Sequence, residues 1–153
     1  MRKNLARRIA LAAVVILAAA FVVGCASPFD KYADKPLNLT FLETSDIHGS
    51  IFPYNFITAK PAPTSLAQVA TIVNQERAAN PDGTILLDDG DALQGQPVVY
   101  YYNFLKTDAP NIWGQVTNFL KYDAVSVGNH DIEAGHQVYD KLYKEMTASV
   151  VCA

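Results

Sequence analysis

The stretch that decides the fold class is residues 84–91, which read TILLDDGD. An apolar run of strand length ends here directly in three carboxylates and a glycine, which is typical of a buried strand that runs into a polar loop. Residues 65–79 carry apolar side chains at helical spacing, and residues 37–44 alternate as a strand does. The prolines of 53–63 indicate a loop, and the Pro-Asp-Gly sequence at 81–83 indicates a turn.

The same alternation continues to the end of the chain. We expect helices at 111–121 and 135–146, and strands at 124–127 and 149–152. An order of strand, helix, strand, helix, strand, helix, strand predicts an α/β fold with a largely parallel sheet. Because the chain stops inside the last expected strand, we expect it to be truncated. The side chains expected to share one face of the first strand are Leu37, Leu39 and Phe41. Those expected to face inward from the helices are Leu66, Val69, Ile72, Val73, Ile112, Val116, Phe119, Leu120, Val138, Leu142 and Met146.

The N-terminus predicts a targeting signal. Four basic residues precede an unbroken apolar run at 9–23, which is short for a membrane span and has the length of a signal-peptide core. The run ends in Gly24 and Cys25, which resembles the cleavage site of bacterial lipoproteins and predicts a lipidated Cys25. An uncleaved anchor helix is the alternative. The expected parts are a lipoprotein signal peptide at 1–24, a tether at 25–36 and the folded part at 37–153, held outside the cytoplasm at the outer membrane, in the periplasm or on the cell surface.

The charge of the mature chain limits its partners. Removing the signal peptide takes away four of the 12 basic residues and none of the 15 acidic ones, so the net charge becomes −7. This argues against binding of a nucleic-acid polymer by a basic patch, and no protein partner can be inferred. An acidic protein that handles phosphates needs positive charge from elsewhere, and bound metal is the obvious source. With Cys25 acylated, Cys152 has no disulfide partner, and its apolar neighbours predict a small buried residue.

Three polar clusters stand where the predicted strands end, which is where sites gather in open α/β sheets. In the first cluster, Asp46 and His48 are two residues apart, so in an extended segment both side chains can reach one metal ion. In the third, Asn129 offers a neutral carbonyl oxygen, and His130 can donate a proton or place a charge near the substrate. A capped loop or a turn is the alternative interpretation of each cluster.

The second cluster, at 88–91, contains three carboxylates, which repel one another unless a cation or solvent screens them. Asp88 follows the apolar strand directly, so we expect it to be partly buried and to bond loop amides. Asp91 has two oxygens and can bridge two cations, and the missing side chain of Gly90 is expected to allow close approach to the ions. A solvated acidic turn is the alternative.

The joint occurrence of the three clusters favours a metal site. Mixed oxygen and nitrogen ligands suit zinc, manganese, iron or cobalt. Two such divalent ions about 3.5–4 Å apart would clamp a phosphoryl group and lower the pKa of a bound water. That metal-activated water would then attack phosphorus in line.

Three blocks, DIH at 46–48, GDALQG at 90–95 and GNHD at 128–131, resemble the first three blocks of the calcineurin-like metallophosphoesterases. The longer strings LETSDIHG at 42–49 and LLDDGDALQG at 86–95 resemble the 5′-nucleotidase family in particular. The Glu-Thr lead-in of the first string looks closer to its 2′,3′-cyclic-nucleotide 2′-phosphodiesterase branch. The resemblance implies that the folded part is the N-terminal part of an α/β/β/α sandwich.

The resemblance also implies roles for single residues. His130 would stabilise the transition state or protonate the leaving oxygen, and Glu133 stands where the family places a carboxylate that orients this histidine. The family string after Gly-Asn-His is Glu-Phe followed by Asp or Asn, from which this sequence departs. His136 has no family role and is expected to be structural or solvent-facing. The implied metal ligands are Asp46 and His48 for the first ion, Asp91 for both ions and Asn129 for the second.

The leading hypothesis is metal-dependent hydrolysis of nucleotide phosphoesters outside the cytoplasm for nucleotide salvage, with a nucleotide as substrate and the membrane contacted through lipidated Cys25. The later histidine block and the nucleoside-binding domain of the family are missing from these residues, so we expect weak metal binding and little activity from this chain alone. One alternative is a metallophosphoesterase for a non-nucleotide or nucleotide-sugar substrate. Another is a non-catalytic, lipid-anchored binding protein.

Overall fold

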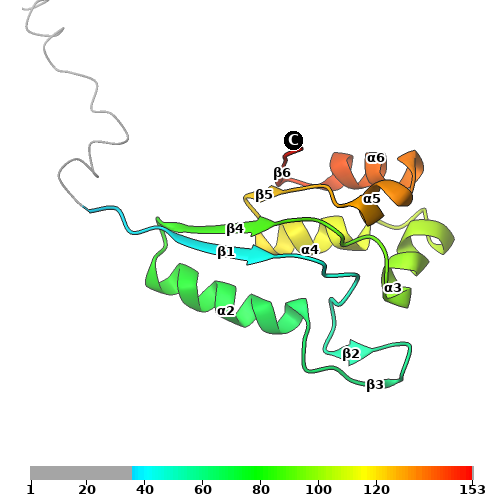
Figure 1. Cartoon of the computed structure of the whole chain (residues 1–153), viewed down its shortest axis with the longest axis horizontal. Helices are drawn as coiled ribbons and strands as arrows, with labels where there is room; N and C mark the ends of the chain where they lie inside the picture. The colour runs from blue at the N-terminus through cyan, green and yellow to red at the C-terminus, as the bar shows by residue number, and fades with distance from the viewer. Residues whose placement is uncertain (1–35, 153) are drawn as a thin grey trace, which may run out of the picture. The chain divides into compact units, whose positions relative to one another are not determined.

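A computed structural model describes residues 36–152 of the chain (Figure 1). The chain forms two units, Met1–Leu37 and Asn38–Ala153, and the second holds nearly all of the described residues. The predicted signal peptide, the predicted lipidation of Cys25 and nearly all of the predicted tether lie outside the described residues. Among the residues that are described, no helix combines the length and the hydrophobicity needed to cross a bilayer.

The second unit is built on a four-stranded parallel sheet, which confirms the predicted α/β class. The proline-rich segment predicted as a loop holds a short antiparallel hairpin apart from this sheet. The strands are β1 (Thr40–Thr44), β4 (Thr84–Asp88), β5 (Ala124–Val125) and β6 (Ser149–Val150), in the order β1-β4-β5-β6, and the hairpin strands are β2 (Tyr54–Asn55) and β3 (Lys60–Pro61).

Helices connect each strand to the next, and the three longest ones were all predicted. The others were missed for reasons visible in their sequence. Residues 97–105 read PVVYYYNFL, in which β-branched and aromatic residues show no helical period, and α5 is too short for any period to emerge. The helices are α2 (Leu66–Ala79), α3 (Pro97–Tyr100), the π-helical turn η2 (Tyr101–Leu105), α4 (Ile112–Leu120), α5 (Asn129–Glu133) and α6 (His136–Glu145).

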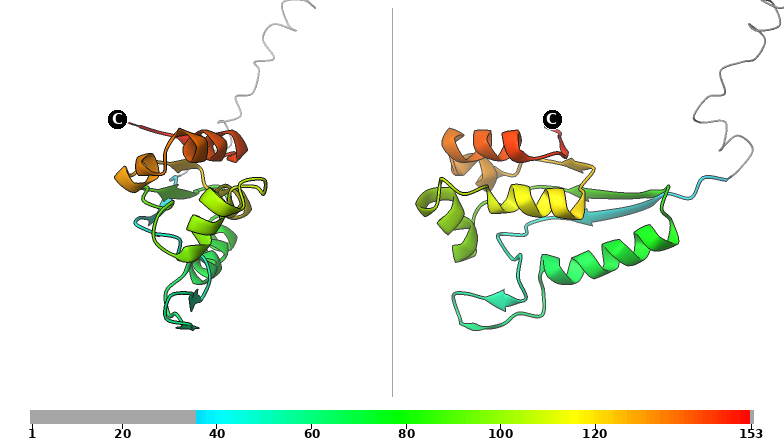
Figure 2. Two further views of the ribbon diagram at one scale, coloured as in Figure 1. Left: turned by 90° about the vertical axis from the view of Figure 1, so that its right-hand side faces the viewer. Right: turned by 180° about the vertical axis from the view of Figure 1, so that it is seen from behind.

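The two faces of the sheet differ in what covers them. Because the strands follow chain order, right-handed crossovers place the connecting helices on one face. Figure 1 shows α4 behind β1 and β4, and Figure 2 shows it in front of them from the opposite side. Leu42 and Leu86 pair in register and point toward the helices, whereas Phe41 on the other face is 61% exposed. The face predicted to be shared by Leu37, Leu39 and Phe41 is therefore the exposed one among the described residues.

The core lies between the sheet and the helices. Leu86 is fully buried, and Leu66 and Val73 on α2 are 2% and 1% exposed. Two predicted inward residues were wrong, since Ile72 is 52% and Phe119 is 80% exposed. Ile72 directly precedes buried Val73, and Phe119 directly precedes buried Leu120. Neighbouring positions are about 100° apart around a helix, so an apolar residue beside the buried stripe can point outward.

Cys152 was also predicted wrongly, because its thiol is exposed. It lies two residues past β6, which is an edge strand of the sheet. The apolar run around it matched the composition of a buried strand, but β6 pairs over two residues only.

Candidate active site

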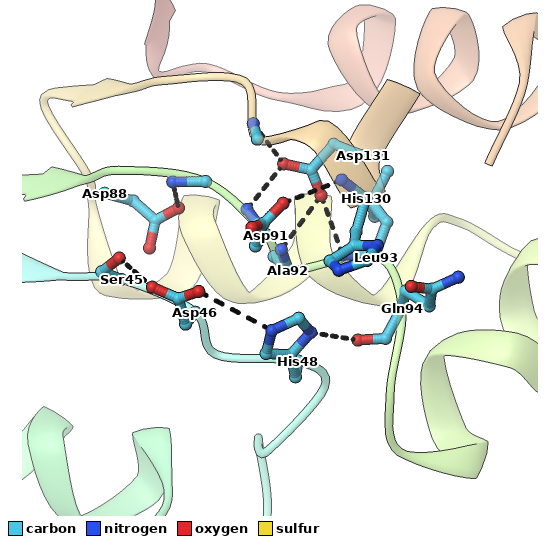
Figure 3. Close-up of polar contacts among 12 residues, drawn as sticks. Ser45, Asp46, His48, Asp88, Asp91, Ala92, Leu93, Gln94, His130 and Asp131 are labelled. Atoms are coloured by element: carbon cyan, nitrogen blue, oxygen red, sulfur yellow. Dashed lines mark hydrogen bonds and ion pairs between the residues drawn. The ribbon is translucent and has the colours of Figure 1, made fainter. Parts of the chain in front are cut away.

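The three polar clusters come together at the carboxyl edge of the sheet (Figure 3). The loops that follow β1 and β4 remain hydrogen-bonded beyond the strands. The backbone N–H of Asp46 donates to the carbonyl of Gly90 at 3.1 Å, and that of His48 donates to the carbonyl of Asp91 at 2.9 Å. The parallel pairing of the strands therefore fixes the relative position of the first two clusters.

Asp46 and His48 approach each other by a route other than the predicted one. The segment is not extended, since both residues adopt left-handed backbone conformations, with φ of 52° and 48°. The two turns bring Asp46 Oδ1 to 3.8 Å from His48 Nε2, and Ser45 donates a hydrogen bond to the other Asp46 oxygen. The predicted proximity holds, but a turn produces it.

A hydrogen bond at the other ring nitrogen of His48 fixes the tautomer of the ring. His48 Nδ1 lies 2.9 Å from the carbonyl oxygen of Gln94. A carbonyl oxygen only accepts, so Nδ1 carries the hydrogen and donates it. Nε2, which faces Asp46, is then free to act as a metal ligand while the Gln94 carbonyl holds the ring in place.

Asp91 lies between the first and third clusters. It is also left-handed, with φ of 60°, and its Oδ1 accepts from the backbone N–H of His130 at 2.9 Å. One terminal amide atom of Asn129 lies 3.3 Å from Asp91 Oδ2. The amide nitrogen would donate to this carboxylate without a cation, and rotation of the amide would present its oxygen to a cation shared with Asp91.

Gly90 is required for a reason different from the predicted one. A Cβ at Gly90 would lie 2.3 Å from the backbone nitrogen of Gly128, so the loops after β4 and β5 meet backbone to backbone. A Cβ at Gly128 would in turn lie 2.1 Å from Asp91 Oδ1. Both glycines therefore allow the second and third clusters to touch, whereas the prediction assigned Gly90 to the approach of ions.

Backbone strain is concentrated at this site. Five non-glycine residues of the described chain have positive φ, and three of them are the predicted ligands Asp46, His48 and Asp91. A left-handed conformation costs an L-residue on the order of 1–2 kcal/mol. Such strain persists only where the surroundings enforce it, and it clusters at functional sites.

His130 and Glu133 form the predicted pair. His130 Nδ1 lies 2.8 Å from Glu133 Oε2, one turn along α5. The hydrogen bond that His130 donates to the Glu133 carboxylate raises the pKa of His130 above its ordinary value, against a smaller lowering by desolvation. The departure from the family string therefore retains a carboxylate in contact with the histidine.

The donor atoms suit a divalent cation. His48, Asp91 and His130 each offer one ligand atom, and these atoms lie within 4.8 Å of one another. The rings of His48 and His130 are 5.4 Å apart between centroids. The predicted ligands form a mixed nitrogen and oxygen set, made of the His48 imidazole, the carboxylates of Asp46 and Asp91 and the Asn129 amide, which fits the chemistry of a first-row transition metal.

The neighbouring carboxylates behave differently from Asp91. Asp88 is 4% exposed and accepts from Thr44 Oγ1 at 2.5 Å and from the Gly90 N–H at 3.0 Å, which confirms the predicted burial and amide contact. Desolvation by burial raises the pKa of Asp88 to about 6. Asp89 is exposed to solvent. Neither contributes to the group formed around Asp91.

One site residue was missed by the sequence interpretation. Asp131 is buried, and its carboxylate accepts four backbone hydrogen bonds from the loops that carry Asp91 and Gly128. An acid three residues after the cap of a helix is a known capping signal, which could have identified the bond from Gly128 but not the three bonds from the other loop. His136 lies outside the site with an 83% exposed side chain that contacts Tyr139, as predicted for a solvent-facing residue.

Comparison with known proteins relates these features to nucleotide phosphoesterases. No family model matches the chain. It is 33% identical to the trifunctional nucleotide phosphoesterase protein YfkN of Bacillus subtilis over 133 residues, which cover 81% of this chain. A solved structure of YfkN, a calcineurin-like phosphoesterase, matches with a TM-score of 0.68 at 32% identity, covering 74% of this chain and 36% of that one. The 5′-nucleotidase of Bos taurus is 32% identical over 127 residues, or 79% of this chain.

The relatives are much longer than the part they share with this chain. The match spans 9% of YfkN and 21% of the bovine 5′-nucleotidase. It spans 16% of the 2′,3′-cyclic-nucleotide 2′-phosphodiesterase/3′-nucleotidase of Yersinia enterocolitica, at 28% identity over 65% of this chain. The chain belongs to the calcineurin-like phosphoesterases, in the family of 5′-nucleotidases and cyclic-nucleotide phosphodiesterases.

Proposed function

We propose that the protein is a metal-dependent hydrolase of nucleotide phosphoesters, acting as a 5′-nucleotidase, as a 2′,3′-cyclic-nucleotide 2′-phosphodiesterase, or as both. The observation that carries the proposal is that His48, Asp91 and His130, which follow three different strands, bring one ligand atom each to within 4.8 Å of one another at the edge of a parallel sheet. The names of the relatives indicate nucleotides as the substrate class.

Four side chains would hold the metal. Asp46 and His48 would bind one ion, Asp91 would contact two and Asn129 would bind the second. Two divalent ions, when bound, supply positive charge to the phosphoryl group and acidify a water molecule for attack on phosphorus. Their charge also offsets the acidity of the chain, which would otherwise repel an anionic substrate.

His130 would act on the reacting groups directly. Its Nδ1 is held by Glu133 at 2.8 Å, so the ring is oriented and Nε2 remains available. The same hydrogen bond raises the pKa of His130 and favours the imidazolium. An imidazolium at the edge of the site can stabilise the charge that develops on phosphate oxygens and can give its proton to the leaving oxygen.

The place of action is proposed from the N-terminal sequence. A lipidated Cys25 would attach the protein to a membrane outside the cytoplasm, where nucleotides are salvaged by hydrolysis to diffusible nucleosides. This part of the proposal depends on the lipoprotein signal alone and is separate from the chemistry of the site.

The test is an assay of the full-length protein with AMP, 2′,3′-cyclic AMP and a nucleotide-sugar. We expect hydrolysis of at least one of the first two, loss of turnover after chelation and recovery with added zinc, manganese, iron or cobalt. Turnover that survives complete metal removal would contradict the mechanism. Hydrolysis of the nucleotide-sugar alone would move the protein to another substrate class within the same family.

A further inference from the structure

The buried carboxylate of Asp131 joins two of the loops that form the site (Figure 3). Its Oδ2 accepts the backbone N–H of Asp91 at 2.9 Å and that of Gly128 at 3.0 Å. Its Oδ1 accepts the N–H groups of Ala92 at 3.0 Å and of Leu93 at 2.9 Å. One side chain therefore holds the loop after β4 and the loop after β5 at the same time.

Within the described part of the chain, the charge of Asp131 is not held by a salt bridge. The residue is 5% exposed. Four N–H dipoles converge on it instead, and charge-assisted hydrogen bonds of this kind are stronger than neutral ones. An ionised carboxylate is the side chain that can accept all four bonds at once.

The N–H groups in turn depend on Asp131. Strand β4 ends at Asp88, so the N–H groups of Asp91, Ala92 and Leu93 lie beyond the strand pairing and donate to Asp131 instead. Ala92 is fully buried and Leu93 is 2% exposed, which keeps solvent away from their backbone. A buried N–H without an acceptor costs on the order of 1–3 kcal/mol, so the loop would rearrange if Asp131 lost its acceptor oxygens.

We propose that Asp131 is a positioning residue that keeps Asp91 in register with Asn129 and His130 for metal binding, an inference that rests on the proposed function. The contacts that fix these residues relative to one another are short, and each depends on the others. Asp91 Oδ1 reaches the His130 N–H at 2.9 Å only because the loops pack as closely as Gly90 and Gly128 allow. Asp131 holds both partners of that contact.

The variant Asp131→Asn tests this role with almost no change of shape. Its amide group has one acceptor oxygen, so its nitrogen would face two of the four backbone N–H donors. We expect the affinity of the full-length protein for zinc or manganese to fall on the order of 10–100-fold, which is the usual effect of losing a residue that orients a metal ligand. Calorimetric titration with the metal alone measures this without reference to turnover. Asp131→Glu keeps the carboxylate and should recover most of the affinity.

Two control variants separate positioning from lost stability. Asp123→Asn removes a carboxylate that accepts the Leu86 N–H at 2.8 Å, between the middle of β4 and the start of β5, and it should leave metal affinity unchanged because neither residue belongs to the site loops. Val73→Ala opens a small cavity in the core of α2 and should lower stability without lowering affinity. If Val73→Ala weakened metal binding as much as Asp131→Asn does, the positioning role would be refuted.

Hydrogen exchange gives a second measurement, in which the wild-type protein by itself can overturn the inference. The amides of Asp91, Ala92, Leu93 and Gly128 should be protected in the metal-free protein, and Asp131→Asn should remove that protection. Exchange of these amides in the wild type at the rate of exposed loop amides would overturn the inference. So would unchanged metal affinity in Asp131→Asn. A wild-type protein that binds no metal would instead overturn the proposed function, and the inference with it.

Discussion

Replacing Asp88 by asparagine should stabilise the metal-free protein at neutral pH. Asp88 is 4% exposed at the end of β4, where Thr44 Oγ1 and the Gly90 N–H donate to it. Burial raises its pKa, and these two hydrogen bonds only partly oppose the effect. Asparagine has the same shape, and its oxygen can accept from Gly90 while its nitrogen donates to Thr44. The hydroxyl of Thr44 can then donate to Tyr122, 2.8 Å away.

The size of the effect follows from the pKa, which rises from 3.8 to about 6. A shift of this size corresponds to roughly 3 kcal/mol. Because the folded-state pKa lies above the unfolded value, the contribution of Asp88 to stability is complete below about pH 4 and is lost as the pH rises through 6. At pH 7.5 the ionised carboxylate thus costs up to roughly 3 kcal/mol, and Asp88→Asn should recover most of it.

Denaturant unfolding of the metal-free protein between pH 4 and 8 measures this prediction. The difference in unfolding free energy between Asp88→Asn and wild type should be small at pH 4 and should grow in favour of the variant up to pH 7. Asp89→Asn changes an exposed carboxylate of the same loop and should show no such trend. A variant that is less stable than wild type at pH 7.5, but not at pH 4, would refute the reasoning.

Three other predictions concern strain, the catalytic pair and the anchor. Asp46→Gly relieves a φ of 52° and should raise the unfolding free energy by about 0.5–1 kcal/mol, while metal binding is lost. Lys121→Gly, at a φ of 55°, should raise the unfolding free energy by a similar amount and leave metal binding intact. Equal loss of metal from both variants would contradict this prediction. Glu133→Gln should lower the pKa of His130 in an NMR titration of the metal-free protein, and an unchanged pKa would show that Glu133 does not set it. Cys25→Ser should move the protein from the membrane fraction to the soluble fraction, and a variant that still fractionates wholly with lipid would refute the lipoprotein signal.

The arrangement of the sheet could be predicted from the sequence because its signals are local. The apolar run at 84–87 and the helical stripe of α2 each indicate an element without reference to the rest of the chain. Parallel order and right-handed crossovers then place the strand ends at one edge. This general rule is sufficient to bring Asp46, Asp91 and Asn129 to the same place.

The details of the site could not be predicted in this way, because they depend on contacts between loops. The left-handed turns at Asp46 and His48 carry no glycine to signal them, so an extended segment was the natural expectation. The close packing of Gly90 on Gly128 joins residues far apart in the chain, and a local pattern does not show it. The role of Asp131 likewise appears only when both loops are in place, since three of its four donors come from the other loop.

The second source of error was the prediction of which face of a helix or strand is buried. The exposed positions of Ile72 and Phe119 show that apolar character alone does not choose between neighbouring positions on a helix. At the first strand, the face predicted from Leu39 and Phe41 is the exposed one, because the helices cover the face that carries Leu42 and Thr44. Which face is covered depends on the crossovers, and these are a property of the whole sheet.

The central claim, that Asp91 holds a pair of metal ions, is tested most directly by the metal content of the full-length protein. Asp91→Asn keeps the shape of the side chain but removes the charge with which one carboxylate can contact two cations. We predict two divalent ions per wild-type chain by mass spectrometry, loss of metal in Asp91→Asn with turnover reduced by more than about 100-fold, and near-normal metal and turnover in the exposed Asp89→Asn. Two bound ions and near-normal turnover in Asp91→Asn, with loss of both in Asp89→Asn, would contradict the account.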